Sequence, residues 1–181
     1  MLKEFRPSIY FLLKFLGVYF LGNVAYGLFV ESFSSGPDFI TVHVARQVSS
    51  LLNITGESVT VTASHLRPIA LLIHDQKSVL NVYEGCNGIN VMVVFVAFLI
   101  AYGGRWKNIV WFLPLGIVTI HLFNLLRIFG LYVVALNYQE YFYYIHKYIF
   151  TAFIYFIVFV LWIIWIFKLN VRPAKISTKD N

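Results

Sequence analysis

The stretch Glu84-Gly85-Cys86-Asn87-Gly88-Ile89-Asn90 stands where a polar segment of the chain gives way to an apolar run, residues 89–102. It contains the only cysteine among the 181 residues. A lone thiol at the mouth of an apolar helix is either a small buried side chain or a nucleophile. This stretch alone leaves both roles open. The two roles are distinguished by which other residues of the chain lie at the same depth in the membrane as the cysteine.

The composition predicts an integral membrane protein. Hydrophobic residues make up 60% of the chain, charged residues only 12%, and the mean hydropathy is +0.76, which a soluble domain of this size does not sustain. The net charge of +6 comes from basic residues at the ends of apolar runs and not from one solvated face, so we expect no nucleic-acid partner. One cysteine, with no zinc-like Cys/His spacing, predicts neither a metal nor another cofactor.

Four apolar runs indicate an all-α polytopic fold, a single integral membrane domain over residues 1–181. The expected transmembrane helices are about residues 8–30, 88–102, 109–136 and 148–167, and the first is interpreted as a retained signal anchor. Residues 31–87 form a predicted external insertion. Within it, residues 38–52 show the spacing of an amphipathic helix, and residues 57–83 contain short β-prone runs typical of a hairpin.

Basic residues predict the orientation of these helices. With the N-terminus inside, nine Lys and Arg residues fall on cytoplasmic segments and four on external ones. Because Lys and Arg accumulate on the cytoplasmic side, both termini are predicted to be cytoplasmic, and the bilayer itself is an expected partner.

Three reactive side chains from three predicted helices then share one depth. Cys86 opens the second helix and His146 lies at the start of the fourth. Arg127 lies 18 residues after Ile109, about 27 Å along the third helix at 1.5 Å per residue. This places all three at the external boundary of a hydrocarbon core about 30 Å thick.

These residue types are the ones that acyl transfer through a thiolate requires. A histidine can accept the thiol proton and later donate a proton to the leaving amine. A guanidinium can stabilise the oxyanion of the tetrahedral intermediate, and flanking glycines allow backbone N–H groups to approach the reacting carbonyl. Each residue also has a structural alternative: a buried small side chain for Cys86, a helix-stabilising hydrogen bond for Arg127, and a lipid headgroup contact for His146.

Four further residues are candidates for supporting the three: Glu84, Asn87, Gly88 and Asn124. Asn124 precedes Arg127 by one helical turn on the same face, where it can orient the guanidinium. The other histidines are predicted to have structural roles. His121 is expected to pack or hydrogen-bond within the bundle, and His43, His65 and His74 are expected at the surface.

Cys86-Asn87-Gly88 at the mouth of a helix, then Asn124-Leu125-Leu126-Arg127-Ile128, then His146 before a last helix, resemble the exosortase/archaeosortase family, over roughly residues 81–165. The short chain resembles the compact F subtype of Bacteroidetes. The resemblance implies a membrane cysteine protease or transpeptidase with Cys86, Arg127 and His146 as catalytic residues and an active site on the periplasmic side. Its substrates would be exported proteins with a C-terminal motif, a transmembrane helix and a basic tail, and the acyl group would pass to an amine or to water.

The sequence departs from that family at two points. Asn87 follows the cysteine where many members have Ala or Ser, and the chain is shorter than typical exosortases. Two other functions stay open: a non-catalytic membrane subunit of an export or assembly system, in which Arg127 pairs with a carboxylate of a partner helix, and an enzyme that acts on lipid substrates.

Overall fold

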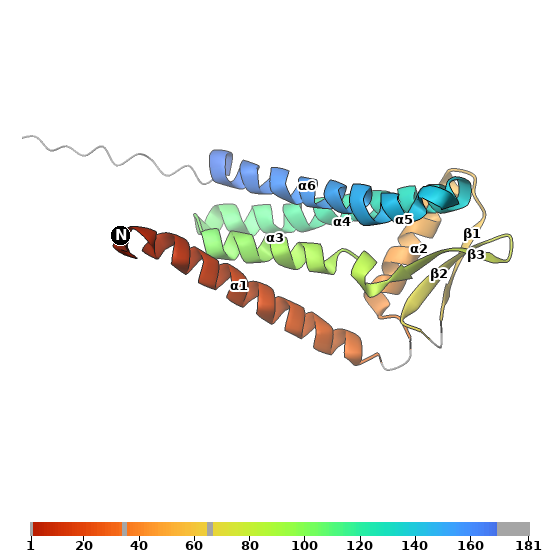
Figure 1. The fold of residues 1–181 in the computed structure, drawn as a ribbon, viewed down its shortest axis with the longest axis horizontal. Coiled ribbons are helices and arrows are strands. Elements are labelled where there is room, and N and C mark those ends of the chain that lie inside the picture. Colours follow the sequence, from red (N-terminus) through yellow and green to blue (C-terminus); the bar gives the residue numbers. More distant parts are fainter. Residues whose placement is uncertain (1, 34–35, 65–66, 170–181) are drawn as a thin grey trace, which may run out of the picture.

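The computed structural model describes residues 2–33, 36–64 and 67–169. His65 and most of the basic tail, about which the sequence made predictions, lie outside these residues. Five long helices and a small sheet build the described part (Figure 1). The long helices are α1 (Leu2–Glu31), α2 (Phe39–Ile54), α3 (Ile89–Tyr102), α4 (Trp106–Asn137) and α6 (Phe150–Ile164).

Within the described part of the chain, three helical segments have the length and hydropathy needed to cross a membrane: Phe5–Glu31, Trp106–Asn137 and Gln139–Leu169. The third is continuous through the short helix α5 (Phe142–Tyr144) into α6. The fourth expected span, residues 88–102, forms α3, which has only 14 residues. At 1.5 Å per residue it covers about 21 Å, less than the core of a bilayer. The four-span prediction is therefore not confirmed by helix length.

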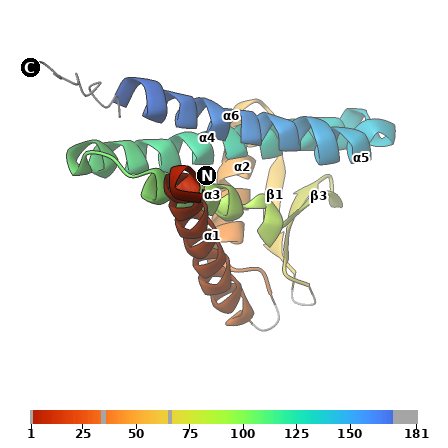
Figure 2. The same cartoon turned by 60° about the vertical axis from the view of Figure 1, so that its left-hand side comes forward.

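Helices α3, α4 and α6 pack against one another, whereas α1 packs mainly on α3 and diverges from the others (Figures 1 and 2). Close approach of α1 to α3 depends on Gly22, because a Cβ there would lie 2.7 Å from a methyl group of Val93. Gly116 of α4 similarly leaves room for the ring of Phe95 in α3. Small residues at such contacts are the usual way in which membrane helices come close together.

The predicted β-prone runs of residues 57–83 form three strands, so the expected hairpin is part of a three-stranded sheet: β1 (Val59–Ala63), β2 (Ile69–His74) and β3 (Lys77–Tyr83). They pair antiparallel in the order β1-β2-β3. The turn between β2 and β3 consists of Asp75 and Gln76, both with positive φ (49° and 62°), which matches the right-handed twist of a hairpin. β3 is thus an edge strand that leads directly into Glu84 and Cys86.

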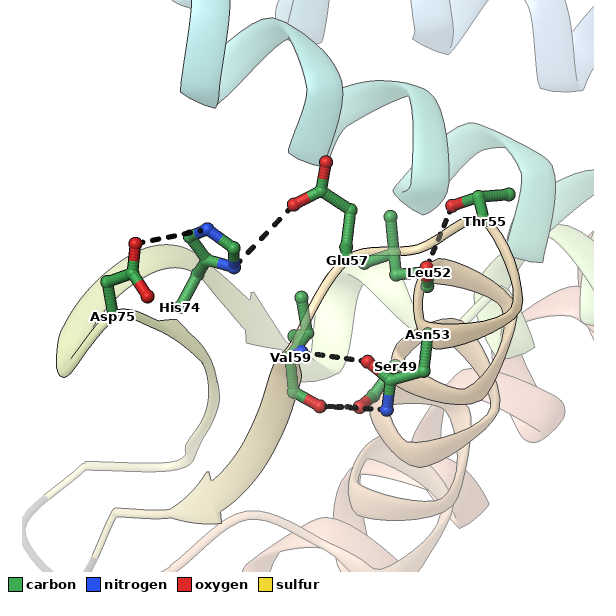
Figure 3. A network of polar contacts seen from close by, with 8 residues as sticks. All are labelled: Ser49, Leu52, Asn53, Thr55, Glu57, Val59, His74 and Asp75. Carbon is green, nitrogen blue, oxygen red and sulfur yellow. Dashed lines mark hydrogen bonds and ion pairs between the residues drawn. The ribbon is translucent and has the colours of Figure 1, made fainter.

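The structure confirms the prediction that α2 is amphipathic, and α2 packs against the sheet. Asp38 caps its N-terminus through hydrogen bonds from the backbone N–H groups of Ile40 and Thr41. Its apolar side chains are fully buried: Val44, Ala45, Val48 and Leu52. Figure 3 shows the hydrogen bonds between its polar side chains and β1. Ser49 and Asn53 both donate to the carbonyl of Val59, at 2.6 and 3.1 Å, and the N–H of Val59 donates to Asn53 at 2.8 Å.

The histidines outside the proposed site have structural partners. His121 of α4 contacts Gln47 of α2 at 2.9 Å, in agreement with a hydrogen-bonding role. His74 is only partly exposed and lies between the carboxylates of Glu57 and Asp75, at 3.6 and 3.4 Å (Figure 3). His43 is exposed on α2.

The described part has two apolar cores. One joins α2, the sheet and the C-terminal half of α4, and it includes Cys86 itself. The other lies between α3, the N-terminal half of α4 and the last helical segment, where Phe95, Phe112 and Trp165 are fully buried. The segment 84–88 stands between β3 of the first core and α3 of the second.

Candidate active site around Cys86

Cys86 ends a 3₁₀ turn, Glu84–Cys86, between β3 and α3, and only 4% of its surface is exposed. The chain then enters α3 through Gly88, whose φ of +88° is one that L side chains rarely adopt. A Cβ at Gly88 would also lie 3.1 Å from the side chain of Asn124. Both the conformation and the close approach explain why a glycine stands two residues after the cysteine.

Asn124 of α4 links the cysteine segment to Arg127. Its Nδ2 donates a hydrogen bond of 2.9 Å to the backbone carbonyl of Cys86, and its Oδ1 accepts one of 3.3 Å from Nη1 of Arg127. Asn124 is completely buried, and Arg127 is 7% exposed. One amide thus links the backbone of Cys86 to the guanidinium of Arg127.

His146, from the segment before α6, lies next to Cys86. Its Nε2 lies 3.8 Å from the Sγ of Cys86, across 60 residues of sequence. The ring is held by Phe142, which stacks on it at a centroid distance of 5.7 Å, and the carbonyl of His146 accepts a hydrogen bond from Thr151 at 3.2 Å. The segment Ile145–Ile149 is a π-helical turn, a local irregularity that is frequent at functional sites.

The charge of Arg127 has no counter-ion among the described residues. No carboxylate in that part of the chain forms an ion pair with it, and its Nε is buried without a hydrogen-bond partner. A buried guanidinium is costly to leave unpaired. Its position therefore favours interaction with a negative group that forms or binds at the site.

Burial raises the pKa of the Cys86 thiol, and the charge of Arg127 acts in the opposite direction, as do hydrogen bonds from Tyr83 and Arg127 to the thiolate. Because burial prevails, the resting side chain is a protonated thiol. A neighbouring base is then needed to generate the thiolate, and His146 stands in that position.

Tyr83 is a site residue that the sequence analysis missed. It ends β3 three positions before the cysteine, its ring lies against Gly85, and it lines both pockets described below. The negative charge of the Cys86 thiolate is the main reason why the pKa of Tyr83 is raised. The signal available in the sequence was the alternation of side chains along a strand. This alternation predicts that Tyr83 points to the opposite face of β3 from the buried Val82.

Two of the predicted supporting residues face away from the thiol. Asn87, 1% exposed, donates to the hydroxyl groups of Tyr26 in α1 and Thr41 in α2, at 2.5 and 3.1 Å, and accepts from the N–H of Ile89 at 3.0 Å. It therefore anchors the cysteine segment to α1 and α2. Glu84 contributes its backbone carbonyl, which accepts from the Tyr26 hydroxyl at 3.5 Å.

Two pockets border the site, and both include Tyr83 and His146. The sheet-side pocket, about 250 Å³, is lined by Cys86 and lies along β3 between α4 and α5, with apolar walls from Leu80, Val82, Ile128, Leu131 and Phe142. The helix-side pocket, about 470 Å³, lies between α3 and α6 and includes Arg127, Lys147, Ile154 and Tyr155.

The fold and the site define a multi-pass membrane protein in which a buried thiol lies beside an imidazole and a guanidinium that has no carboxylate partner in the described part of the chain. Comparison with known families agrees with this description. The family model described as transmembrane exosortase matches residues 10–167, and the chain belongs to that family. The match extends to most of α1 and all of α2, beyond the region in which the sequence motifs lie. Searches of curated proteins and of solved structures found no match.

Proposed function

We propose that the protein is a cysteine protease or transpeptidase that forms a thioacyl intermediate on Cys86. The observation that carries this proposal is the 3.8 Å approach of His146 Nε2 to the only thiol of the chain, beside an arginine with no carboxylate partner among the described residues. Membership of the exosortase family supports the same reaction class. The arrangement contains a nucleophile, a base and a source of positive charge within one site.

In the first step His146 takes the thiol proton while Sγ attacks the carbonyl carbon of the scissile peptide bond. The carbonyl oxygen becomes an oxyanion near Arg127, whose buried Nε has a free N–H. When the tetrahedral intermediate collapses, the C–N bond breaks and His146 returns its proton to the leaving amine. An acceptor amine or water then attacks the thioester, gives its proton to His146 and releases the thiol.

The proposed substrates are exported proteins with a C-terminal motif, a transmembrane helix and a basic tail. The helix-side pocket supports this class, because it borders His146 and continues alongside α6, a helix of the third candidate span. A substrate helix within the same bilayer would lie alongside this pocket and bring its preceding residues to Cys86. The basic tail would then lie on the side of the membrane where this chain places Arg105 and Lys107.

We further propose four membrane crossings, with both termini in the cytoplasm and the site on the periplasmic side of a bacterial inner membrane. For this topology α3 must cross together with the turn that precedes it. The 3₁₀ turn Glu84–Cys86 and Gly88 extend α3 outward and are held against α4 by Asn124. The excess of basic residues on the inner segments supports the orientation.

Trapping of the acyl-enzyme tests the proposal. The full-length chain would be produced in bacterial membranes with a fusion substrate that ends in a transmembrane helix and a basic tail, and tryptic peptides containing Cys86 would be analysed by mass spectrometry. We expect a hydroxylamine-sensitive peptide adduct on Cys86 in the wild type and its loss in His146→Ala. His43→Ala, at an exposed histidine of α2, is the matched control and should retain the adduct.

Two outcomes would overturn the proposal. One is processing of the fusion substrate at an unchanged rate by Cys86→Ala, which would show that the thiol is not the nucleophile and would favour a lipid-directed or other chemistry. The other is the absence of any adduct together with co-purification of a partner membrane protein through Arg127. That result would indicate a non-catalytic subunit.

A further inference from the structure

The sheet-side pocket has a composition and a position that the reaction at Cys86 does not by itself require. Its walls are apolar, its volume is about 250 Å³, and one end is formed by Cys86 and His146. At about 30 Å³ for each water-sized group, it has room for about eight such groups. This is enough for one aliphatic or aromatic side chain.

The lining of this pocket shows that it runs along the edge of the sheet. Leu80, Asn81, Val82 and Tyr83 are consecutive residues of β3, and all four line it. Successive side chains of a strand point to opposite faces, so four in a row can border one cavity only if it follows the strand edge. β3 is an edge strand of the described sheet, with β2 on its other side. The unpaired N–H and C=O groups of such an edge can bind an extended chain as an additional strand.

The two pockets share Tyr83 and His146 as lining residues, and of the two it is the sheet-side pocket that Cys86 lines. The helix-side pocket continues between α3 and α6, toward Ile154 and Tyr155. The sheet-side pocket lies against β3 and Leu131, at the end of α4 that meets the sheet. A polypeptide that enters the membrane after its cleavage site would place its membrane segment at the first pocket. Its preceding residues would then lie in the second.

The geometry points to the sheet-side pocket as the specificity site for the acyl part of the substrate. An extended segment lies along the edge of β3, and the residue whose carbonyl Cys86 attacks inserts an apolar side chain between Leu80, Ile128 and Leu131. This inference rests on the proposed function, because it assigns a direction to the substrate of that reaction. It adds the chemical class of the residue that precedes the cleaved bond.

Peptide chloromethyl ketones test the inference without knowledge of the natural substrate. N-acetyl-Ala-X-chloromethyl ketones, with X as Gly, Leu, Phe or Lys, place the side chain of X next to the reacting carbon. The thiolate displaces chloride and forms a C–S bond on Cys86. The rate of alkylation would be measured by mass spectrometry on the full-length protein in detergent micelles, with iodoacetamide as a reagent that reports thiol reactivity alone.

We expect the Leu and Phe reagents to alkylate Cys86 at least about tenfold faster than the Gly and Lys reagents, since a well-fitted apolar pocket discriminates by that order. Leu80→Phe, which narrows the pocket, should remove the advantage of the Leu reagent, and Leu131→Ala, which enlarges it, should favour the Phe reagent. Leu126→Ala is the matched control on the same helix, because Leu126 is 55% exposed and does not line the pocket.

Failure of this inference is distinguishable from failure of the proposed function. Equal rates for all four peptide reagents, with iodoacetamide alkylation still lowered by His146→Ala, would overturn the pocket assignment and leave the nucleophile in place. If His146→Ala changes the rate for none of the reagents, His146 does not act on the thiol. That result would contradict both proposals. If Leu131→Ala does not fold, the order of alkylation rates in the wild type and in Leu80→Phe decides whether the pocket assignment holds.

Discussion

Asn124 donates a hydrogen bond of 2.9 Å to the backbone carbonyl of Cys86, across 38 residues of sequence and from a different helix. The same amide accepts a hydrogen bond from Arg127 at 3.3 Å. It therefore sets the distance between the segment that carries Cys86 and the guanidinium of Arg127. The geometry of this site depends on a neutral side chain as much as on the three reactive ones.

Asn124→Ala is expected to lower both stability and acylation of Cys86. The substitution leaves the carbonyl of Cys86 and the Nη1 of Arg127 without this partner in a buried site, at a cost of about 1–3 kcal/mol for each unsatisfied group. Asn137→Ala is the matched control on α4, because Asn137 is exposed and bonds only to the carbonyl of Val133 in its own helix. Thermal unfolding in detergent and adduct formation would be measured in parallel, and equal behaviour of the two variants would contradict the positioning role.

Arg127→Gln is expected to shift the pH profile of Cys86 alkylation to higher pH. The positive charge of Arg127 lowers the pKa of the thiol against the larger effect of burial, so its removal raises that pKa further. At a fixed pH below the pKa, less thiolate is present and iodoacetamide reacts more slowly. Arg105→Gln is the control, since Arg105 is exposed and lies about 33 Å along α4 from Arg127 at 1.5 Å per residue. A shift to lower pH in Arg127→Gln would show that the guanidinium does not act on the thiolate.

His146→Gln is expected to reduce the rate of substrate acylation by about a hundredfold to ten-thousandfold, the usual contribution of a general base. Glutamine retains a polar side chain at the position but cannot take the proton from Cys86 at neutral pH. The single-turnover rate of adduct formation is the appropriate measurement, because it isolates the step in which the thiol loses its proton. The assignment would be wrong if the variant reacted as fast as the wild type while its melting temperature was unchanged.

Gly88→Ala is expected to destabilise the fold and to displace the cysteine segment. A non-glycine residue at φ +88° costs about 1–2 kcal/mol, and the added Cβ would press on the side chain of Asn124 at 3.1 Å. Gly27→Ala is the control, since no neighbour lies within 4 Å of a Cβ there and alanine favours the helix by up to about 1 kcal/mol. The melting temperatures of the two variants should therefore change in opposite directions, and a neutral Gly88→Ala would contradict the strain argument.

The parts of the fold that depend on local pattern were predictable. The apolar runs in α1, in α4 and in the helical segment Gln139–Leu169 are long enough to be recognised by length alone, and the spacing of Val44, Val48 and Leu52 indicated a helix buried on one face. The β-prone runs recognised in residues 57–83 correspond to β1, β2 and β3. The sequence did not show that β1 joins β2 in one sheet and is hydrogen-bonded to α2 through Val59, because these contacts depend on how the elements pack together.

By itself the sequence determined the membrane class, the single thiol at the mouth of α3, and the order in which Cys86, Arg127 and His146 follow one another. These properties depend on composition and on helical rise, which are local. Only the tertiary structure decided that His146 reaches Cys86, that Asn87 faces Tyr26 and Thr41, and that Tyr83 borders both pockets. Which side chains meet across a bundle depends on the rotation and tilt of each helix about its axis, and these are set by the packing of all the helices together.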